Sequence, residues 1–440
     1  ISLGYLLQNS IQLSSIVIIG RLGAPELSIA ASGFMIATCT GWLLAVGGTT
    51  ALEDVLGSKS FTKADEDITM IGVYLHRCLC VMAALYTPVA TLWCFCGPIL
   101  EFCGQSHELA YGTQGFLRLL APFGLGYIYF EALKKFLQVQ NIRAPGTLIL
   151  LFVAIANIPL CWAVVHKFGF GFVGGVLVTG SMYWLACLLA AAYICFIDGH
   201  EAWVRPSKKM LAGLYEFTST ALTGLIMVGA EWWAFELIAV AAGVMGGVPI
   251  AAQSILMTVD TIFTVIPFGI GVAASNRIGN LLGMHKIRGA RVAAHATSAI
   301  AIIFGCINMS IIFFGRKMFS ELFSDDEEVI SLAVDVFPWG AAFQVVDGLQ
   351  AVNSGCLRAI GRGDIGAMVN IAAYYAVAIP LGLLVGFKLN WGLHGLWLGL
   401  AVALSIVGIG EFLIVNVVQW NRFTAYELGK VDETNNECEQ

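Results

Sequence analysis

Residues 228–243 read VGAEWWAFELIAVAAG, a run that is apolar enough to lie in a membrane and yet holds two carboxylates, Glu231 and Glu236. From Phe217 to Ile250 these two are the only charged residues. An acid at the centre of a membrane helix costs about 2.5 to 3.5 kcal/mol on insertion scales, so such acids persist mainly where they face a partner or a cavity. The stretch therefore predicts a membrane helix in which an acid has a function.

The composition of the whole chain agrees with a membrane solvent. The chain has 440 residues, of which 58% are hydrophobic and 12% are charged. A soluble chain would carry about 25% charged residues. We therefore expect an integral membrane protein whose surface partner is the lipid bilayer. The net charge of −6 gives no indication of a nucleic-acid partner.

The apolar runs predict twelve α-helical spans, because about 20 helical residues cross a hydrocarbon core of about 30 Å. We place them at residues 1–19, 27–52, 67–97, 112–138, 147–166, 171–197, 213–242, 249–273, 292–315, 328–356, 365–387 and 392–420. The connections after even-numbered spans, counted together with Lys134 and Lys135 near the end of the fourth span, hold 14 Lys and Arg residues, and those after odd-numbered spans hold 5. Because basic loops stay in the cytoplasm, this bias predicts that both termini are cytoplasmic.

An internal repeat divides the chain into halves. The sequence SIAAS at 28–32 is echoed by PIAAQS at 249–254, and IPL at 158–160 recurs at 379–381, in both cases with an offset of 221 residues. Two halves of six spans predict two pseudo-symmetric lobes around a central cavity, as in many transporters. We place an N-terminal lobe at 1–200, a cytoplasmic linker at 201–212, a C-terminal lobe at 213–421 and a disordered cytoplasmic tail at 422–440.

Four motifs carry a resemblance to a known family. They are GRLGAPEL at 20–27, EWWAFE at 231–236, AASNRIGNLLG at 273–283 and CLRAIGRGDIGAMVNIAAYYAVAIPLGLLVGF at 356–387. Together they resemble the multidrug and toxic compound extrusion (MATE) family in its eukaryotic, fungal-like branch. The resemblance implies a secondary antiporter that exports organic cations, xenobiotics or metabolites in exchange for protons, or for Na⁺ in some branches. It also implies that Glu231 and Asp347 are the cavity acids.

The first half departs from the pattern of many prokaryotic members, which carry an essential Asp on the first span. Here that span offers only Gln8, Asn9 and Gln12, which do not titrate. Glu131 lies late in the fourth span and close to Lys134 and Lys135, which favour its charged form. We therefore expect the proton site to lie in the C-terminal lobe.

That lobe contains further candidates for the site. Asp347 is the only charged residue between Asp335 and Arg358, and Asp260 lies eleven residues into the eighth predicted span. Glu236 is five residues from Glu231, about 140° around a helix, so we expect one of these two to face the cavity and the other to pack inside the lobe. Asp260 is either a supporting acid or part of a structural network. The lobe also offers hydrogen-bond partners for these acids. Each of them could equally serve only the packing of the helices, and they are Gln253, Asn370 and Tyr374.

Three prolines stand inside predicted spans. Pro159, Pro267 and Pro380 each remove a backbone hydrogen bond and are expected to kink their helices. Such kinks are either hinges that gate transport or static bends that improve packing.

The mechanism we expect is alternating access, in which a proton and a small cationic or amphipathic substrate compete for the same carboxylate. The sequence leaves open whether H⁺ or Na⁺ is the coupling ion, and whether the plasma membrane or the vacuolar membrane is the location. No enzyme motif of the G-x-S-x-G, H-E-x-x-H or G-x-x-x-x-G-K-[ST] type occurs, so we expect no enzyme. We also expect a monomer without cofactor or metal.

Two other classes of membrane protein are alternatives to an antiporter. A lipid or oligosaccharide-lipid flippase on a related scaffold is expected to have a cationic cavity for anionic headgroups, whereas the candidate residues here are acidic. A channel is expected to show a selectivity filter, which we do not find in the sequence. The twelve cysteines include no C-x-x-C pair and are expected to be small core residues.

Overall fold

The computed structural model of the chain describes residues 2–52, 65–102, 105–140, 142–204, 210, 212–284, 286–324 and 326–417. Among these residues, twelve helices are long and apolar enough to cross a membrane. The prediction of an all-α protein with twelve spans is confirmed, and the chain is a multi-pass integral membrane protein. The predicted tail at 422–440 and residues 205–209 and 211 of the predicted linker lie outside the described residues.

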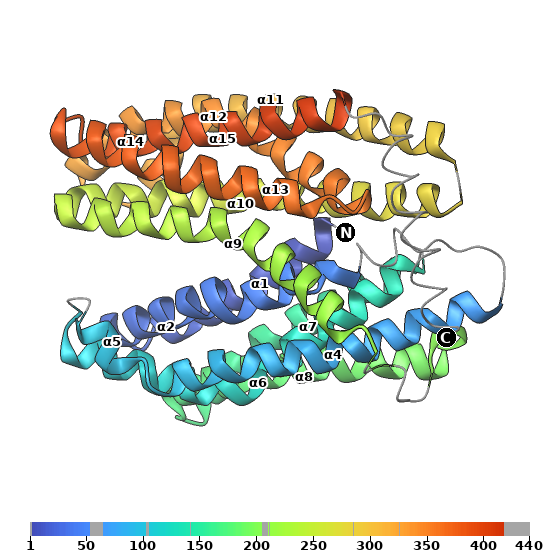
Figure 1. Cartoon of the computed structure of the whole chain (residues 1–440). Helices are drawn as coiled ribbons and strands as arrows, with labels where there is room; N and C mark the ends of the chain where they lie inside the picture. The colour runs from blue at the N-terminus through green and yellow to red at the C-terminus, as the bar shows by residue number, and fades with distance from the viewer. Residues whose placement is uncertain are drawn as a thin grey trace. The chain divides into compact units, whose positions relative to one another are not determined.

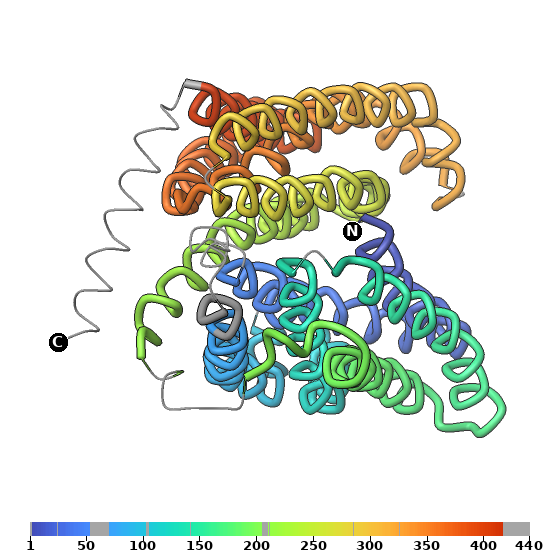
Figure 2. Tube along the Cα trace, turned by 90° about the vertical axis from the view of Figure 1, so that its right-hand side faces the viewer, coloured from blue at the N-terminus to red at the C-terminus, as the bar shows by residue number. Residues whose placement is uncertain are grey.

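The described residues form two compact units, one from Leu3 to Leu225 and one from Ile226 to Val417 (Figures 1 and 2). The first unit contains α1 (Ser2–Gly20), α2 (Ala24–Ala37), η1 (Thr38–Trp42), η2 (Leu44–Gly48), α4 (Asp65–Cys94), α5 (Gly97–Phe102), α6 (His107–Val139), α7 (Ala144–Trp162), η3 (Ala163–Lys167), α8 (Gly171–Phe196) and η4 (His200–Ala202). The second contains α10 (Gly247–Gly283), α11 (Ile287–Phe323), α12 (Glu327–Ala359), α13 (Gly363–Ile371), η6 (Ala372–Ala378), α14 (Ile379–Leu383), η7 (Leu384–Lys388) and α15 (Leu393–Val417). The division falls within α9 (Leu214–Met245).

Two of the prolines stand one turn before a change in helix type. Pro159 in α7 is followed by the π-helix η3, and Pro380 in α14 by the π-helix η7. The two π-helices begin at Ala163 and Leu384, so they are separated by the same 221 residues as the sequence repeat. By contrast, α10 runs unbroken through Pro267. A gating role for any of the three prolines stays a prediction.

The repeat continues into the turns that follow the π-helices. Gly169 and Gly171 have φ angles of 72° and 56°, and Asn390 and Gly392 have φ angles of 57° and 55°. Glycine adopts this left-handed conformation without steric cost, and asparagine tolerates it better than most residues do. Since both pairs again differ by 221 positions, the two halves share backbone detail that a weak sequence repeat indicates only at a few positions.

Trp42 is the centre of an aromatic cluster in the first unit. Its ring centroid lies 4.1 Å from that of Tyr127, 5.3 Å from that of Tyr183 and 5.9 Å from that of Trp93. These rings come from η1, α6, α8 and α4, and Trp42 is buried. Aromatic side chains bury a large apolar area each, so this cluster holds four spans together.

The described residues of the second unit include two separate apolar cores. Phe343 and Val407 belong to one core, and Val352 and Val415 belong to the other. Both cores therefore draw on α12 and on α15. Most of the buried polar side chains of the candidate site belong to these two helices.

Candidate functional site

Helix α12 carries a row of buried polar side chains. Gln344, Asp347, Gln350, Ser354 and Arg358 follow one another at spacings of three or four residues, and none is more than 7% exposed. This spacing places them on one face of the helix. At 1.5 Å per residue the row is about 21 Å long and ends at the last turn of α12. We call these five residues the α12 row.

Two acids from neighbouring helices are bound to amides of the α12 row. Gln350 Nε2 donates to Glu231 Oε2 of α9 over 2.7 Å, and Gln344 Nε2 donates to Asp260 Oδ1 of α10 over 2.8 Å. The third acid, Asp347, belongs to the row itself and lies close enough to both Glu231 and Asp260 to interact with them electrostatically. The structure thus brings together three of the four acids that the sequence singled out, Glu231, Asp260 and Asp347.

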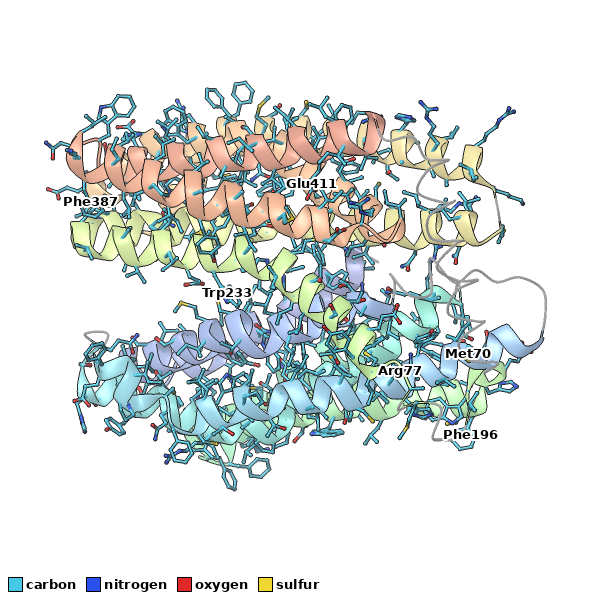
Figure 3. All side chains as sticks on the ribbon, viewed as in Figure 1. Met70, Arg77, Phe196, Trp233, Phe387 and Glu411 are labelled. Atoms are coloured by element: carbon cyan, nitrogen blue, oxygen red, sulfur yellow. The ribbon has the colours of Figure 1, made fainter. Side chains whose placement is uncertain are left out.

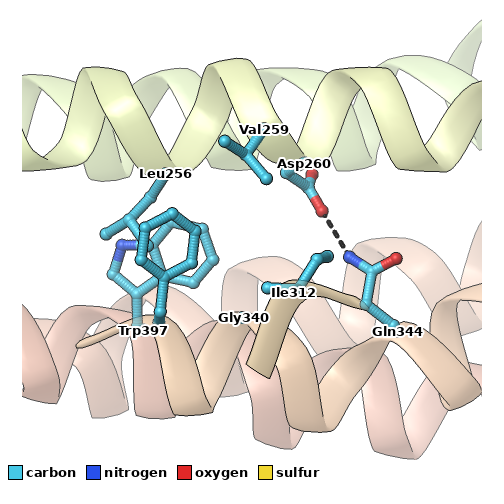
Figure 4. Close-up of a pocket in the computed structure, with 8 residues that line it drawn as sticks. Leu256, Val259, Asp260, Ile312, Gly340, Gln344 and Trp397 are labelled. Carbon is cyan, nitrogen blue, oxygen red and sulfur yellow. Dashed lines mark hydrogen bonds between the residues drawn. The ribbon is translucent and has the colours of Figure 1, made fainter. Parts of the chain in front are cut away.

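A small pocket lies beside Asp260. Leu256 and Val259 line it from α10, Ile312 from α11, Phe337, Gly340 and Gln344 from α12, and Trp397 from α15. Figure 4 shows Asp260 and Gln344, joined by their hydrogen bond, at one end of the pocket and Trp397 at the other. The walls are otherwise apolar, so a group that entered would meet one carboxylate in a hydrophobic surrounding.

The remaining candidates of the second unit are fixed by hydrogen bonds. The Tyr374 hydroxyl donates to Gln350 Oε1 over 3.1 Å, which joins it to the amide that binds Glu231. Gln253 instead accepts from Trp397 Nε1 over 2.6 Å, and Asn370 Nδ2 donates to the Met227 carbonyl oxygen over 2.7 Å. Tyr374 therefore belongs to the acid network, whereas Gln253 and Asn370 connect helices.

Glu236 is half-buried on α9. Its separation of five residues from Glu231 turns it to another face of that helix, as the sequence predicted. Thr264 of α10 was not a sequence candidate, yet its hydroxyl lies 3.5 Å from Asp347 Oδ2.

A fourth acid, Glu411 of α15, was missed by the sequence analysis. It is 0% exposed, and Ser354 Oγ of the α12 row donates to its Oε2 over 2.7 Å. Glu411 is the only charged residue of α15, the same signal that drew attention to Glu231. Arg358 is close enough to interact with Glu411 electrostatically, but within the described residues no Lys or Arg nitrogen lies within 4.0 Å of any of the four acids.

The first unit buries its acid in a different way. Lys134 Nζ forms an ion pair with Glu131 Oε1, and Gln8 Nε2 donates to the same carboxylate oxygen over 2.7 Å. Lys134 Nζ also donates to Gln8 Oε1 over 3.1 Å and lies 4.1 Å from the centre of the Tyr5 ring. Lys134, which the sequence places close to Glu131, thus contacts it directly. Gln8 is hydrogen-bonded to both side chains.

Among the residues that the structure describes, no three His, Cys, Asp or Glu side chains are grouped so that they could hold a metal ion. The acids of the second unit are instead spread along the α12 row and are each held by an amide or a hydroxyl. This arrangement can exchange a proton, or a cation of low charge, at one carboxylate at a time.

Comparison with known proteins gives a consistent result. The MatE family model matches residues 1–163 and 225–384. An uncharacterized transporter of Schizosaccharomyces pombe is 33% identical over 430 residues, covering 97% of this chain and 79% of the relative. Protein DETOXIFICATION 17 of Arabidopsis thaliana is 32% identical over 421 residues, covering 95% and 88%. The crystal structure of the eukaryotic MATE transporter AtDTX14 superimposes with a TM-score of 0.91 at 29% identity, covering 98% of this chain and 95% of that one.

Proposed function

The chain belongs to the MatE family of membrane transporters, and we propose that it is a secondary antiporter that exports small organic cations in exchange for protons. Xenobiotics and amphipathic metabolites are the substrate class we assign to it. The name of the DETOXIFICATION relatives supports this assignment, although it is said of those proteins.

The acids around the α12 row are the observation that carries the proposal. Glu231, Asp260 and Asp347 lie in membrane spans with no ion pair inside the described residues. A carboxylate removed from water is stabilised either by a proton or by a cation. Proton and cationic substrate therefore compete for the same groups, and that competition is the chemical basis of antiport.

The cycle then follows from the side on which each species binds. From the outer or lumenal face, protons bind Glu231 or Asp347 and displace the cationic substrate. The change of access carries the protons to the cytoplasmic face, where their loss restores carboxylates that bind the next cation. In this cycle Asp260 supports the other two acids through their mutual repulsion.

The orientation and location belong to the same proposal. The excess of Lys and Arg in the even-numbered connections, 12 against 5 when the buried Lys134 and Lys135 are left out, supports cytoplasmic termini. The transporter then works as a monomer in the plasma membrane or the vacuolar membrane, with no bound cofactor.

Transport of a fluorescent cation by the purified chain in lipid vesicles tests this function. We expect ethidium to be moved against its gradient when a pH gradient is imposed, with the proton flux opposite to the ethidium flux. A Na⁺ gradient at equal pH is the second arm, and transport in that arm alone would replace the proton with Na⁺. Absence of transport under both gradients would refute the antiporter.

A further inference from the structure

Glu411 is a buried acid that the cycle above does not use. It lies six residues before the end of α15, about 9 Å from that end of the helix, and it is 0% exposed. Figure 3 shows Glu411 within the helices of the second unit, while Phe387 lies at the far end of the same unit. The nearer end of α15 is the one that the distribution of basic residues assigns to the cytoplasm.

The contacts of Glu411 differ between its two oxygens. Oε2 accepts the hydrogen bond from Ser354 Oγ over 2.7 Å, whereas Oε1 has no hydrogen-bond partner among the described residues. Gly366 of α13 lies beside Oε1, since a Cβ atom built on Gly366 would be 3.2 Å from it. The carboxylate is therefore held in place by one oxygen and has the other available for a proton.

The α12 row connects Glu411 to the acids in the middle of the span. Gln350, which donates to Glu231, and Ser354, which donates to Glu411, are one turn apart on the same face of α12. One turn further toward the helix end is Arg358, which is 4% exposed and whose Nε has no hydrogen-bond partner in the described part of the chain. Successive turns of α12 therefore contact Glu231 through Gln350 and Glu411 through Ser354, and the next turn carries Arg358.

Several groups influence the charge of Glu411. The titratable or charged side chains that interact with it electrostatically are Arg358 and Cys356 of α12, Glu231 of α9 and Tyr374 of η6. Arg358 is the only cation of this set, and it favours the carboxylate form of Glu411. Glu231 opposes two simultaneous negative charges, so a proton that leaves one of the two acids is attracted by the other.

We propose that Glu411 is an inner proton-accepting residue, which takes the proton from Glu231 and releases it at the cytoplasmic face. This inference rests on the proton-coupled function proposed above. In the transfer an O–H bond of the Glu231 carboxyl group breaks and an O–H bond forms at Glu411 Oε1, with water as the carrier between them. On release the second O–H bond breaks, the proton passes to cytoplasmic water, and Arg358 stabilises the carboxylate that remains.

The variant Glu411→Gln keeps the shape of the side chain and can still accept the Ser354 hydrogen bond, but it cannot take up a proton. In vesicles of known protein orientation, with inner and outer pH set separately, we expect ethidium transport driven by a pH gradient to fall by about tenfold. Its dependence on the cytoplasmic pH should flatten, whereas exchange of ethidium for ethidium at equal pH should persist. Glu411→Asp should retain the dependence on cytoplasmic pH.

Two results would overturn the assignment. One is a Glu411→Gln variant with the wild-type dependence on cytoplasmic pH. The other is an equal loss of gradient-driven transport and of ethidium exchange, which would indicate a structural role. If Glu411→Gln does not fold, Ser354→Ala decides the matter, because losing its hydrogen bond must shift the cytoplasmic pH midpoint. Failure of the wild-type chain to couple ethidium to protons would instead refute the proposed function, and it is measured first.

Discussion

The two units of the molecule hold acidic side chains within their spans under opposite conditions: Glu131 of the first unit is buried, whereas Glu231 of the second is half-buried. In the first unit Lys134 neutralises the charge of Glu131, and Gln8 donates a hydrogen bond to the same carboxylate oxygen. In the second unit Glu231 accepts from the neutral amide of Gln350, which supplies no charge. The comparison teaches that an acid within a span is a candidate for ion coupling only when its charge is left for a mobile partner to neutralise.

The largest effect on proton-coupled transport is expected from Glu231→Gln. This variant replaces the carboxyl group of α9 that exchanges a proton by an amide that cannot. The amide can still accept from Gln350, so the helix contact is kept and the protein should remain folded. We expect proton-coupled transport to be lost while ethidium binding persists in weakened form. Transport in vesicles, together with gel filtration as the folding control, measures both. Wild-type antiport by a folded Glu231→Gln variant would place the coupling elsewhere.

The next largest effect is expected on the pH dependence of transport, which should change with variants of the second unit and not with variants of the first. Asp347→Asn should remove or move the pH midpoint of transport, because it removes an acid that interacts with Glu231 and Asp260. Replacing Gln8, Asn9 and Gln12 together by Ala removes the buried hydrogen bonds of Gln8 with Glu131 and Lys134 and should lower stability, but it leaves every titratable group in place and should keep the pH midpoint. Transport rates over a series of outer pH values check both variants. A shifted midpoint in the first-span variant, with none in Asp347→Asn, would reverse the roles of the two units.

A smaller effect on transport, and a large one on stability, is expected from Lys134→Met. Removing one partner of a buried ion pair destabilises a protein by about 3 to 5 kcal/mol, since the other charge is left unpaired. The double variant Glu131→Gln, Lys134→Met should recover most of this loss and keep the wild-type pH midpoint. Thermal unfolding in detergent and the pH series are the two measurements. A changed midpoint in the double variant would show that the first unit also takes part in proton coupling.

The smallest effect is expected from Tyr374→Phe. It removes the single hydrogen bond to Gln350 Oε1, worth about 1 kcal/mol, and leaves all four acids of the second unit. We expect the transport rate to fall by a few fold with an unchanged pH midpoint. A loss as complete as that of Glu231→Gln would mean that the hydroxyl itself carries protons.

The twelve spans and the all-α fold could be predicted from the sequence because lipid forces each span to satisfy its backbone within one helix. The acids Glu231, Asp260 and Asp347 could be predicted because each interrupts an apolar run. The amide partners of Glu231 and Asp260 could not be predicted, because nothing in the sequence distinguishes Gln350 and Gln344 until the packing of α12 against α9 and α10 is known. Glu411 carries the same signal, since it is the only charged residue of α15, and it lies near the end of that last span.

The role of Gln8 shows the opposite limit. The sequence shows it only as a polar residue of the first span that does not titrate. The structure connects it to Glu131 and Lys134, which lie 123 and 126 residues further along the chain. A contact over such a separation depends on how α1 packs against α6. It cannot be predicted from the sequence around any one of these residues.

The separation between partners also has a consequence for synthesis. Glu131 and Lys134 lie three residues apart on one helix, so α6 can enter the bilayer with that charge already paired. The donor of Glu231, Gln350, lies 119 residues further along the chain. At about 5 to 20 residues per second, α9 waits roughly 6 to 24 seconds before the ribosome has made its partner. During that interval the translocon or a chaperone has to shelter the acid, which makes the second half of the chain the part most exposed to quality control.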